Sequence, residues 1–397
     1  MDMDRAGRAV TAVCGGGTAF CKFLSANDTG DNGSHQSGVL IPKGAVPVIF
    51  DGLFPRGKNQ DRLIRILWHD GSVTDSRAIY YGQGTRDEYR ITRLGTLTGR
   101  GRTGALFVLV RPHGDGDYLA FVLEAEAEID GFLDALGLSP AETNALIDVR
   151  WVSDPQYTDD EQRWLSDYLA TLGEGEGLVF PDTVVMSQKA REWEGCADRS
   201  GRGDIISDPD RKLLAWEECE YRLFRAVEQS RYGRQIGAGF SDMADFVTLA
   251  NEVLNRRKSR AGKSLEHHLE AIFRGNALSF EAQAVTEGRK RPDFIFPSQA
   301  AYRDMSFPEE RLITLAAKTT CKDRWRQILN EADRLRGRDK YLFTLQQGIS
   351  EAQLREMTAE RVRLVVPEPY IKDYPSCAHG DILTLRDFVQ LVQATQC

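Results

Sequence analysis

Short runs of hydrophobic and β-branched residues, separated by Gly-rich turns, dominate the first 150 residues of the chain and predict strands. Two pairs of these runs flank Asp-Gly dipeptides, in 69–71 and 114–116, and Asp-Gly supplies the positive φ that tight hairpin turns require. This part of the chain is therefore predicted to form a compact, mostly β domain. The expected strands are 63–68, 78–81, 105–110 and 118–123.

The pattern changes from about residue 210 onward. Apolar residues recur at helical spacing in 213–227 and in 265–273. Short apolar runs of strand length alternate with these helical stretches, which predicts an α/β domain with a central mixed sheet. The expected strands are 293–296, 312–317, 341–345 and 363–366.

The region between these two parts is rich in Asp, Glu, Gly and Ser, above all in 173–177 and 198–204. Such stretches bury little apolar surface, which is typical of a linker, although a short helix is expected near 159–172. The predicted division is an N-terminal domain over 1–175, a linker over 176–206 and a C-terminal domain over 207–397.

The total composition is that of a globular protein, with 397 residues, 41% hydrophobic and 28% charged residues. A formal net charge of −8 argues at first against a nucleic-acid partner. The distribution of the charges reverses this inference, because acidic residues concentrate in 124–194 while basic residues gather in four short segments. Two DNA-facing surfaces are predicted from these segments, which are 86–102, 256–263, 289–291 and 322–326.

No stretch approaches the roughly 18 consecutive apolar residues that a membrane span needs, and the first eight residues alternate charges instead of opening a signal peptide. The seven cysteines are odd in number, widely spread and without a C-x-x-C pair, which disfavours a disulfide framework or a zinc ribbon. We therefore expect a soluble, cytoplasmic protein with reduced thiols and no membrane partner.

The segment 292–331 carries the most informative candidate chemistry. Asp293 follows a proline and enters a predicted strand, and twenty-five residues later the next strand ends in Lys318. This is the layout of the PD-(D/E)xK nucleases, in which a carboxylate binds Mg²⁺ and a lysine lies beside the attacking water. The position two residues before Lys318 is Ala316, however, where the motif requires an acid.

Two other residues can supply the missing carboxylate. Glu331 lies thirteen residues beyond Lys318 in a predicted helix over 324–331, where residues seven apart share a face, so that it can point at the metal while Arg324 reaches along the DNA. Glu266 lies in an earlier predicted helix, directly after the basic run 256–263. Basic residues close to each candidate metal ligand suit a polyphosphate substrate.

Less specific interpretations remain open for these residues. A Pro-Asp dipeptide and a distant lysine occur together by chance in many proteins, and charged runs are usually solvated helix faces. A DNA-binding regulator with a degenerate nuclease domain is the main alternative function, because of Ala316. Metal-independent chemistry through an H-x-K pair fails, since no histidine is followed two residues later by lysine.

Long strings in both halves make the resemblance specific. The segments 255–266, 292–294, 318–333 and 361–367 resemble the catalytic domain of the EcoRII family of type IIE restriction endonucleases. The segments 24–30, 35–36, 77–81 and 90–93 look like the effector domain of that family, a DNA-binding pseudobarrel similar to the plant B3 domain. The implied fold class is a B3-like pseudobarrel with short helices, followed by an α/β restriction-endonuclease-like domain.

This resemblance implies a homodimeric, Mg²⁺-dependent enzyme that hydrolyses double-stranded DNA at CCWGG (W is A or T) and leaves 5′-phosphate ends. A second copy of the site, bound by the effector domain, relieves autoinhibition, and a cognate DNA methyltransferase is expected in the same restriction-modification system. Asp293 and Glu331 would ligate Mg²⁺, Lys318 would help deprotonate the water, Glu266 would complete the site, and Tyr302 would have a catalytic role that simple packing explains equally well.

The resemblance also assigns DNA contacts. Lys322, Asp323 and Arg324 would read the CC:GG part of the target, because Lys and Arg donate to guanine O6 and N7 while Asp accepts from cytosine N4. Arg257 and Arg260 are further expected contacts with the target DNA. Gly84 and Tyr89 depart from the lysines expected in the family. The residues of the effector domain expected to face DNA are Lys22, Asn27, His35, Arg86, Glu88, Arg90 and Arg93.

Overall fold

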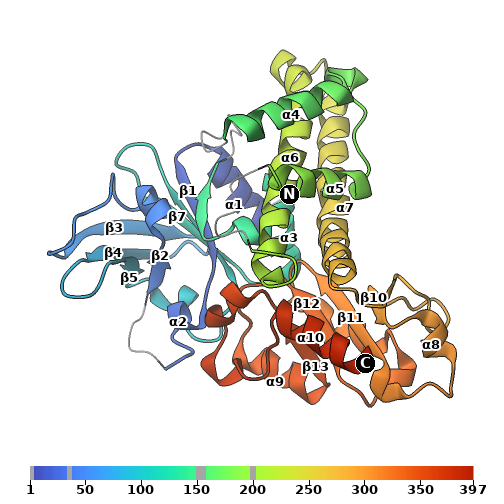
Figure 1. The fold of residues 1–397 in the computed structure, drawn as a ribbon. Helices are drawn as coiled ribbons and strands as arrows, with labels where there is room; N and C mark the ends of the chain where they lie inside the picture. The colour runs from blue at the N-terminus through green and yellow to red at the C-terminus, as the bar shows by residue number, and fades with distance from the viewer. Residues whose placement is uncertain (1–3, 34–37, 149–157, 197–202, 397) are drawn as a thin grey trace.

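The computed structural model describes residues 4–33, 38–148, 158–196 and 203–396. A curved, mostly β half and an α/β half lie side by side, and two long helices stand between and above them (Figure 1). The predicted fold class is confirmed, with a β-rich half-barrel followed by a mixed sheet packed with helices. No helix in the described ranges is long and apolar enough to cross a membrane.

The N-terminal sheet has eight strands within the described residues, in the order β2-β5-β4-β3-β7-β6-β1-β8. Both predicted hairpins are confirmed, because β3 pairs antiparallel with β4 and β6 pairs antiparallel with β7. The parallel pairing of β3 with β7 joins the two hairpins. The strands are β1 (Thr18–Phe23), β2 (Val39–Ile41), β3 (Gln60–Trp68), β4 (Val73–Tyr81), β5 (Glu88–Thr92), β6 (Leu106–Arg111), β7 (Tyr118–Leu123) and β8 (Ala145–Ile147).

Strands β1, β6 and β7 are covered on both faces, since their residues alternate between two separate hydrophobic clusters, whereas the outer face of β3 is exposed at Leu63 and Leu67. Residues such as Phe20 and Phe107 pack inside the curved sheet, whereas their neighbours Cys21 and Val108 pack against helices on the outer face. This alternation follows from the twofold period of a strand. The helices of this half are α1 (Arg5–Cys14), α2 (Ala26–Thr29) and α3 (Glu126–Leu136).

The expectation of a poorly packed linker over 176–206 was wrong for its central part. Thr183–Glu194 form helix α5, which begins at the N-cap Asp182 and packs against α6 and α7. Trp193 and Met186 of α5 are buried with residues of α4 and α6. The acidic flanks concealed this short amphipathic stretch. The helices in this region are α4 (Asp159–Leu172), as predicted, α5, α6 (Pro209–Ala238) and α7 (Met243–Gly275).

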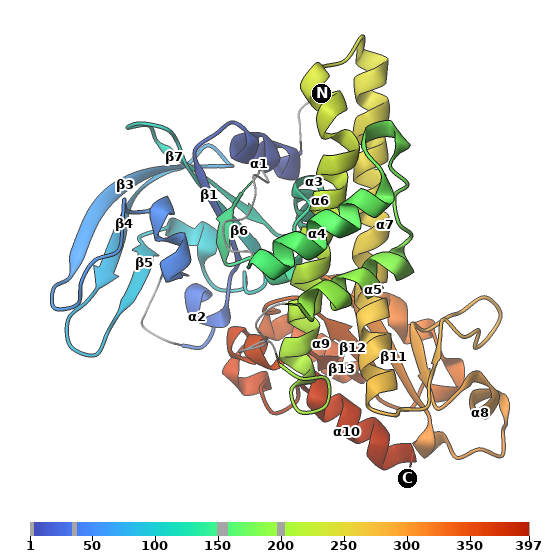
Figure 2. The same cartoon turned by 45° about the horizontal axis from the view of Figure 1, so that its top comes forward.

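The helices α6 and α7 form a long antiparallel pair, and the two views show α4 and α5 crossing it (Figures 1 and 2). A charged cluster is buried where α5, α6 and α7 meet. Nε2 of His268 lies 3.0 Å from Oε2 of Glu220, and Nη1 of Arg260 lies 3.9 Å from the other carboxylate oxygen. The Ser264 hydroxyl donates to Oε1 of Glu217 at 3.3 Å. Burial raises the pKa of Glu217 to about 8, helped by the negative charge of Glu220 and opposed by Arg260.

This cluster predicts a pH dependence of stability. The pKa of Glu217 is higher in the folded than in the unfolded chain, so the folded state binds more protons between about pH 4.5 and 8, and stability falls as the pH rises through that window. Glu217→Gln removes the ionisation and should raise the free energy of unfolding at pH 8.5 by on the order of 1 kcal/mol or more. Urea unfolding at pH 5, 7 and 8.5 measures this. The exposed Glu218→Gln is the matched control, and an unchanged pH dependence in Glu217→Gln would contradict the prediction.

The C-terminal sheet has the order β13-β12-β11-β10-β9, and its strands agree with all four predicted runs. Pairing is antiparallel from β9 to β11 and parallel from β11 to β13, so the sheet is mixed as predicted. The strands are β9 (Glu281–Ala282), β10 (Phe294–Phe296), β11 (Ile313–Lys318), β12 (Lys340–Thr344) and β13 (Val362–Val365). The remaining helices are α8 (Gln299–Arg303), α9 (Glu351–Ala359) and α10 (Leu385–Gln396).

Candidate active site

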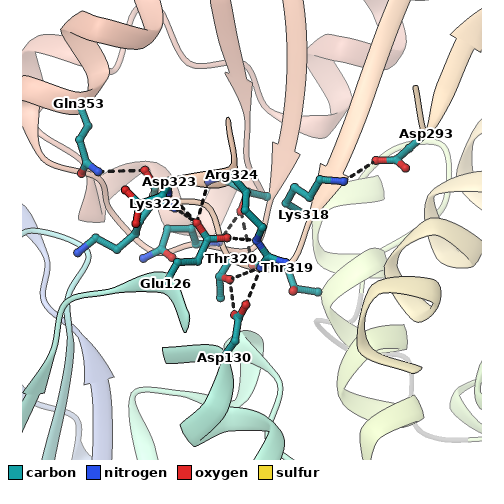
Figure 3. Close-up of polar contacts among 12 residues, drawn as sticks. Glu126, Asp130, Asp293, Lys318, Thr319, Thr320, Lys322, Asp323, Arg324 and Gln353 are labelled. Atoms are coloured by element: carbon teal, nitrogen blue, oxygen red, sulfur yellow. Dashed lines mark hydrogen bonds and ion pairs between the residues drawn. The ribbon is translucent and has the colours of Figure 1, made fainter. Parts of the chain in front are cut away.

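Strands β10 and β11 bring Asp293 and Lys318 together. Phe294 pairs with Leu315 in the antiparallel register, so Asp293, one residue before β10, lies beside the end of β11. Its Oδ2 accepts hydrogen bonds from the backbone N–H of Ala317 at 2.8 Å and from Nζ of Lys318 at 3.1 Å. Figure 3 shows this pair at the end of the strand. Asp293 is only 8% exposed, so the carboxylate has a fixed position beside the lysine.

Glu331 lies within electrostatic reach of this pair. Burial first, and then the negative charge of Asp293, raise the pKa of Glu331 to about 7, against the opposing positive charge of Lys318. The backbone carbonyl of Glu331 accepts a hydrogen bond from the Thr286 hydroxyl at 2.6 Å, which ties this segment to the loop before β10. The three side chains therefore share one site, although sequence separates them by up to 38 positions.

The segment before Glu331 is not the predicted α-helix. Residues Arg324–Asn330 form a 3-10 helix, η6. Because a 3-10 helix has three residues per turn, residues seven apart do not share a face, and Arg324 and Glu331 point to different partners. Ala316 of β11 packs in one hydrophobic cluster with Trp325 and Ile328 of η6. The position where the motif lacks its acid is thus covered by the same turn that delivers Glu331.

Helix α7 supplies Glu266 at the edge of this site. Its Oε2 accepts from Nζ of Lys263 at 2.8 Å, one turn earlier, and from Nε2 of Gln283 at 2.9 Å. The same Gln283 amide donates to Oδ1 of Asp293 at 2.9 Å. The structure therefore places Glu266 one hydrogen-bonded residue away from Asp293.

Tyr302 lies in a neighbouring cluster, where other groups use its hydroxyl. It is buried in α8, donates to a carboxylate oxygen of Glu287 and accepts from the backbone N–H of Arg334 at 3.2 Å. Burial raises the pKa of this phenol. Glu287 also accepts from the N–H of Asp333, so the cluster anchors the chain just after Glu331. These contacts give Tyr302 a structural role and favour packing over direct chemistry.

The donor set suits a hard divalent cation. Carboxylate oxygens are the protein ligands that Mg²⁺ prefers, and Asp293 and Glu331 couple electrostatically inside a half-buried site that a cation would neutralise. In the described residues, no group of three His, Cys, Asp or Glu side chains lies close enough together to hold a metal ion. A site of two carboxylates, completed by water and a phosphate, fits this arrangement.

Helix α3 of the N-terminal half closes over the segment Lys322–Arg324. Oε2 of Glu126 accepts from the backbone N–H groups of Lys322 at 3.0 Å, Asp323 at 2.6 Å and Arg324 at 3.0 Å. Its other oxygen pairs with Nε of Arg324, while Nη2 of Arg324 donates to Asp130 at 2.6 Å. Figure 3 shows both acids facing this segment. Burial alone would raise the pKa of Glu126, but the hydrogen bonds from Asp323 and Arg324 lower it.

Comparison with known proteins identifies the family. A model of the N-terminal domain of restriction endonuclease EcoRII matches residues 14–140, and a model of the EcoRII C terminal matches residues 224–389. The type II restriction enzyme EcoRII of Escherichia coli is 39% identical to the chain over 390 residues, which cover 93% of this chain and 92% of that enzyme. The chain belongs to the EcoRII family. It is a type II restriction endonuclease that acts on DNA, and the predicted resemblance is confirmed.

Other proteins are similar to part of this EcoRII-family enzyme. The type II restriction enzyme SsoII of Shigella sonnei is 27% identical over 142 residues, or 34% of this chain and 45% of that enzyme. A solved structure of Ecl18kI, metal-depleted and with uncleaved, modified DNA, has a TM-score of 0.44 at 19% identity and covers 59% of this chain and 83% of its own. A complex of the restriction endonuclease PspGI with substrate DNA has a TM-score of 0.44 at 16% identity, and covers 54% and 93%.

Arg257 and Arg260, expected to contact DNA, are engaged inside the EcoRII-family chain. Nη2 of Arg257 lies 2.8 Å from Glu228, and its Nη1 donates to the carbonyl of Ala135 at 2.6 Å. Arg260 is 3% exposed and its guanidinium carbon lies 3.7 Å from the centre of the Tyr221 ring. Both lie on the inner face of α7, because the basic run continues through a full helical turn. Of the stretch 256–263, Lys258, Ser259 and Gly262 are exposed.

The expected effector residues divide into exposed and buried sets. Arg86 and Arg93 are exposed, and Arg86 lies over the Tyr81 ring. Lys22 and Arg90 are 5% exposed, with Nζ of Lys22 2.8 Å from Asp28 and Arg90 paired with Glu88 at 3.4 Å. Asn27 is half-buried beside Asp28. His35 lies outside the described residues. Tyr89, one of the two departures from the family, is a core residue whose ring stacks on Tyr80.

Sequence reasoning missed Glu126 and Asp130, which bind Thr320 and the segment Lys322–Arg324 across the contact between the two halves. Both acids lie in the predicted N-terminal domain, within the acid-rich stretch 124–194 that was interpreted only as part of the charge distribution. Their spacing of four residues places both on one face of a helix. That spacing, next to an apolar stripe of Ile129, Phe132 and Leu133, was the available signal.

Proposed function

We propose that this EcoRII-family enzyme hydrolyses double-stranded DNA in a Mg²⁺-dependent reaction at CCWGG, as a homodimer, and leaves 5′-phosphate ends. The observation that carries this proposal is the hydrogen bond from Lys318 to Asp293 at the end of β11, with Glu331 near enough for both charges to shift its pKa. Asp293 and Glu331 would hold the Mg²⁺, which when bound supplies positive charge to the scissile phosphate and a more acidic water. Lys318 orients that water and favours its deprotonated form through the charge of its ammonium group.

Target reading is assigned to Lys322, Asp323 and Arg324. Their donors and acceptor match guanine and cytosine edges in the major groove. The segment begins four residues after Lys318, so a strand read by it passes the catalytic lysine. The CCWGG sequence itself follows from the resemblance to the family.

The effector domain holds the enzyme closed in this proposal. Glu126 and Asp130 occupy the backbone donors and the guanidinium that the target DNA needs, and burial lowers the pKa of Lys322, since it too lies beneath this contact. In the closed form, DNA cannot reach the target-reading segment Lys322–Arg324. Binding of DNA to the effector domain must therefore be coupled to the opening of this contact.

A second interdomain contact supports this coupling. Asp373, at the end of the 3-10 helix Glu368–Asp373, lies close enough to Lys22 and Asp28 for their charges to shift its pKa, which burial raises to about 6. Nearby, the backbone N–H of Ser376 donates to Asn32 at 2.9 Å. A DNA phosphate that pairs with Lys22 competes with Asp373, so the second copy of the site favours separation of the two halves.

Cleavage of plasmids with one or several CCWGG sites tests this function. We expect linear products with 5′-phosphate ends only when Mg²⁺ is present, a faster rate for the two-site plasmid, and a dimer in sedimentation velocity. Chelation with EDTA is the metal control, and a plasmid without CCWGG is the sequence control. Intact plasmid with Mg²⁺ would overturn the proposal, and site-selective binding without cleavage under any divalent ion would favour the DNA-binding regulator instead.

A further inference from the structure

A glutamine that belongs to none of the roles above bridges two acids of the active site. Both N–H bonds of the Gln283 side chain are used, since Nε2 donates to Oε2 of Glu266 and to Oδ1 of Asp293, each at 2.9 Å. Glu266 lies on α7 and Asp293 at the start of β10, so the amide joins two elements that pack separately. Asp293 accepts from Lys318 with its other oxygen, whereas Lys263 contacts both carboxylate oxygens of Glu266.

The backbone of Gln283 is held in an unusual conformation to make this bridge. Its φ is +54°, in the left-handed region that residues other than Gly, Asn and Asp rarely adopt. Its N–H donates to the carbonyl of Asp293 at 3.0 Å, which extends the β9–β10 pairing by one position. A conformation of this kind costs free energy of order 1 kcal/mol and persists where the surroundings determine it.

A neutral donor is the appropriate group at this position. Two carboxylates repel each other in a half-buried site, and this repulsion would separate them or keep one protonated. A lysine would relieve the repulsion but would compete with a divalent cation for the same negative charge. The amide satisfies one lone pair on each carboxylate, keeps the pair close and adds no positive charge to that of Lys263 and Lys318.

We propose that Gln283 is a positioning residue that preorganises Glu266 and Asp293 for a divalent cation. This inference rests on the proposed Mg²⁺-dependent function and adds the residue that sets the affinity of its metal site. Gln283 acts through the two carboxylates and touches neither the phosphate nor the water. Outer-shell partners of metal ligands typically change metal affinity by about 10- to 100-fold when they are replaced.

The test is Mn²⁺ binding to the full-length enzyme without DNA, followed by water-proton relaxation. Gln283→Met keeps the volume and removes the donor, and we expect its Kd for Mn²⁺ to rise about 10- to 100-fold. Gln283→Gly removes the side chain while easing the positive φ, so it should show the same loss even if the Met variant folds poorly. In cleavage assays of both Gln283 variants, the Mg²⁺ concentration that gives the half-maximal rate should also rise. Their kcat at saturating Mg²⁺ should change by less than about fivefold.

Gln299→Met is the matched control. It removes another glutamine amide from the same region, which donates to the carbonyl of Val285 and touches neither acid, so its Mn²⁺ binding should equal that of the wild type. If both Gln283 variants bound Mn²⁺ with the wild-type Kd, the positioning role of Gln283 would be overturned, while the proposed Mg²⁺-dependent function would stand. The proposed function would instead be contradicted if the wild-type enzyme bound no Mn²⁺, or if Asp293→Asn bound Mn²⁺ as tightly as the wild type.

Discussion

Asp293→Asn should reduce the rate of DNA cleavage by about 10³-fold at saturating Mg²⁺. The substitution removes the negative charge that pairs with Lys318 and that would bind the cation, while an amide oxygen at the same position can still accept from the N–H of Ala317. The local fold at the end of β11 is therefore retained, and so is the target-reading segment Lys322–Arg324. Single-turnover cleavage of bound DNA measures the rate, and gel mobility shift in Ca²⁺ measures binding.

A control aspartate distinguishes the effect of losing one negative charge anywhere in the protein from the effect of losing it at the active site. Asp381 lies exposed before α10, and Asp381→Asn changes the net charge by the same amount as Asp293→Asn. We expect Asp381→Asn to cleave at the wild-type rate and Asp293→Asn to bind DNA within a fewfold of the wild type. An undiminished rate for Asp293→Asn would remove Asp293 from the metal site, and loss of DNA binding together with the rate would indicate a structural role.

The strands and the first two site residues followed from local pattern. Four of the five described C-terminal strands, all but β9, and the hairpins at 69–71 and 114–116 were predicted because apolar runs and Asp-Gly turns act over a few residues. Asp293 and Lys318 came together as expected, since each stands at an end of one of two strands that pair. Glu331 also reached the site, although through a 3-10 turn and not through the predicted helix face.

What the sequence did not predict depends on contacts between distant segments. Glu126 and Arg324 are 198 positions apart, and neither residue shows locally that it pairs with the other. The buried position of Arg260 has the same origin, because the basic run 256–263 looks like a solvated face until α5 and α6 pack against it. Gln283 shows no local signal either, since its bridging role depends on α7 and β10 arriving together.

The double substitution Glu126→Gln with Asp130→Asn should release the closed form. It replaces charge-assisted hydrogen bonds to Arg324 and to the Lys322–Arg324 backbone by weaker neutral ones. Each such bond contributes about 1.5–3 kcal/mol, so a loss of about 3 kcal/mol would shift the balance between closed and open forms about 100-fold. Cleavage of one-site DNA should accelerate at least about 10-fold, as measured by initial rates at saturating Mg²⁺.

The rate on two-site DNA decides how this result is interpreted. If α3 blocks the target-reading segment, the double variant cleaves one-site and two-site DNA at similar rates, because the effector no longer has a closed form to open. Glu128→Gln on the same helix is the matched control, since Glu128 pairs with Arg5 inside the N-terminal half and should leave the ratio unchanged. A double variant that still requires the second site would show that the Glu126 and Asp130 contacts do not restrain the enzyme, and the coupling would then have to pass through Asp373 and Lys22.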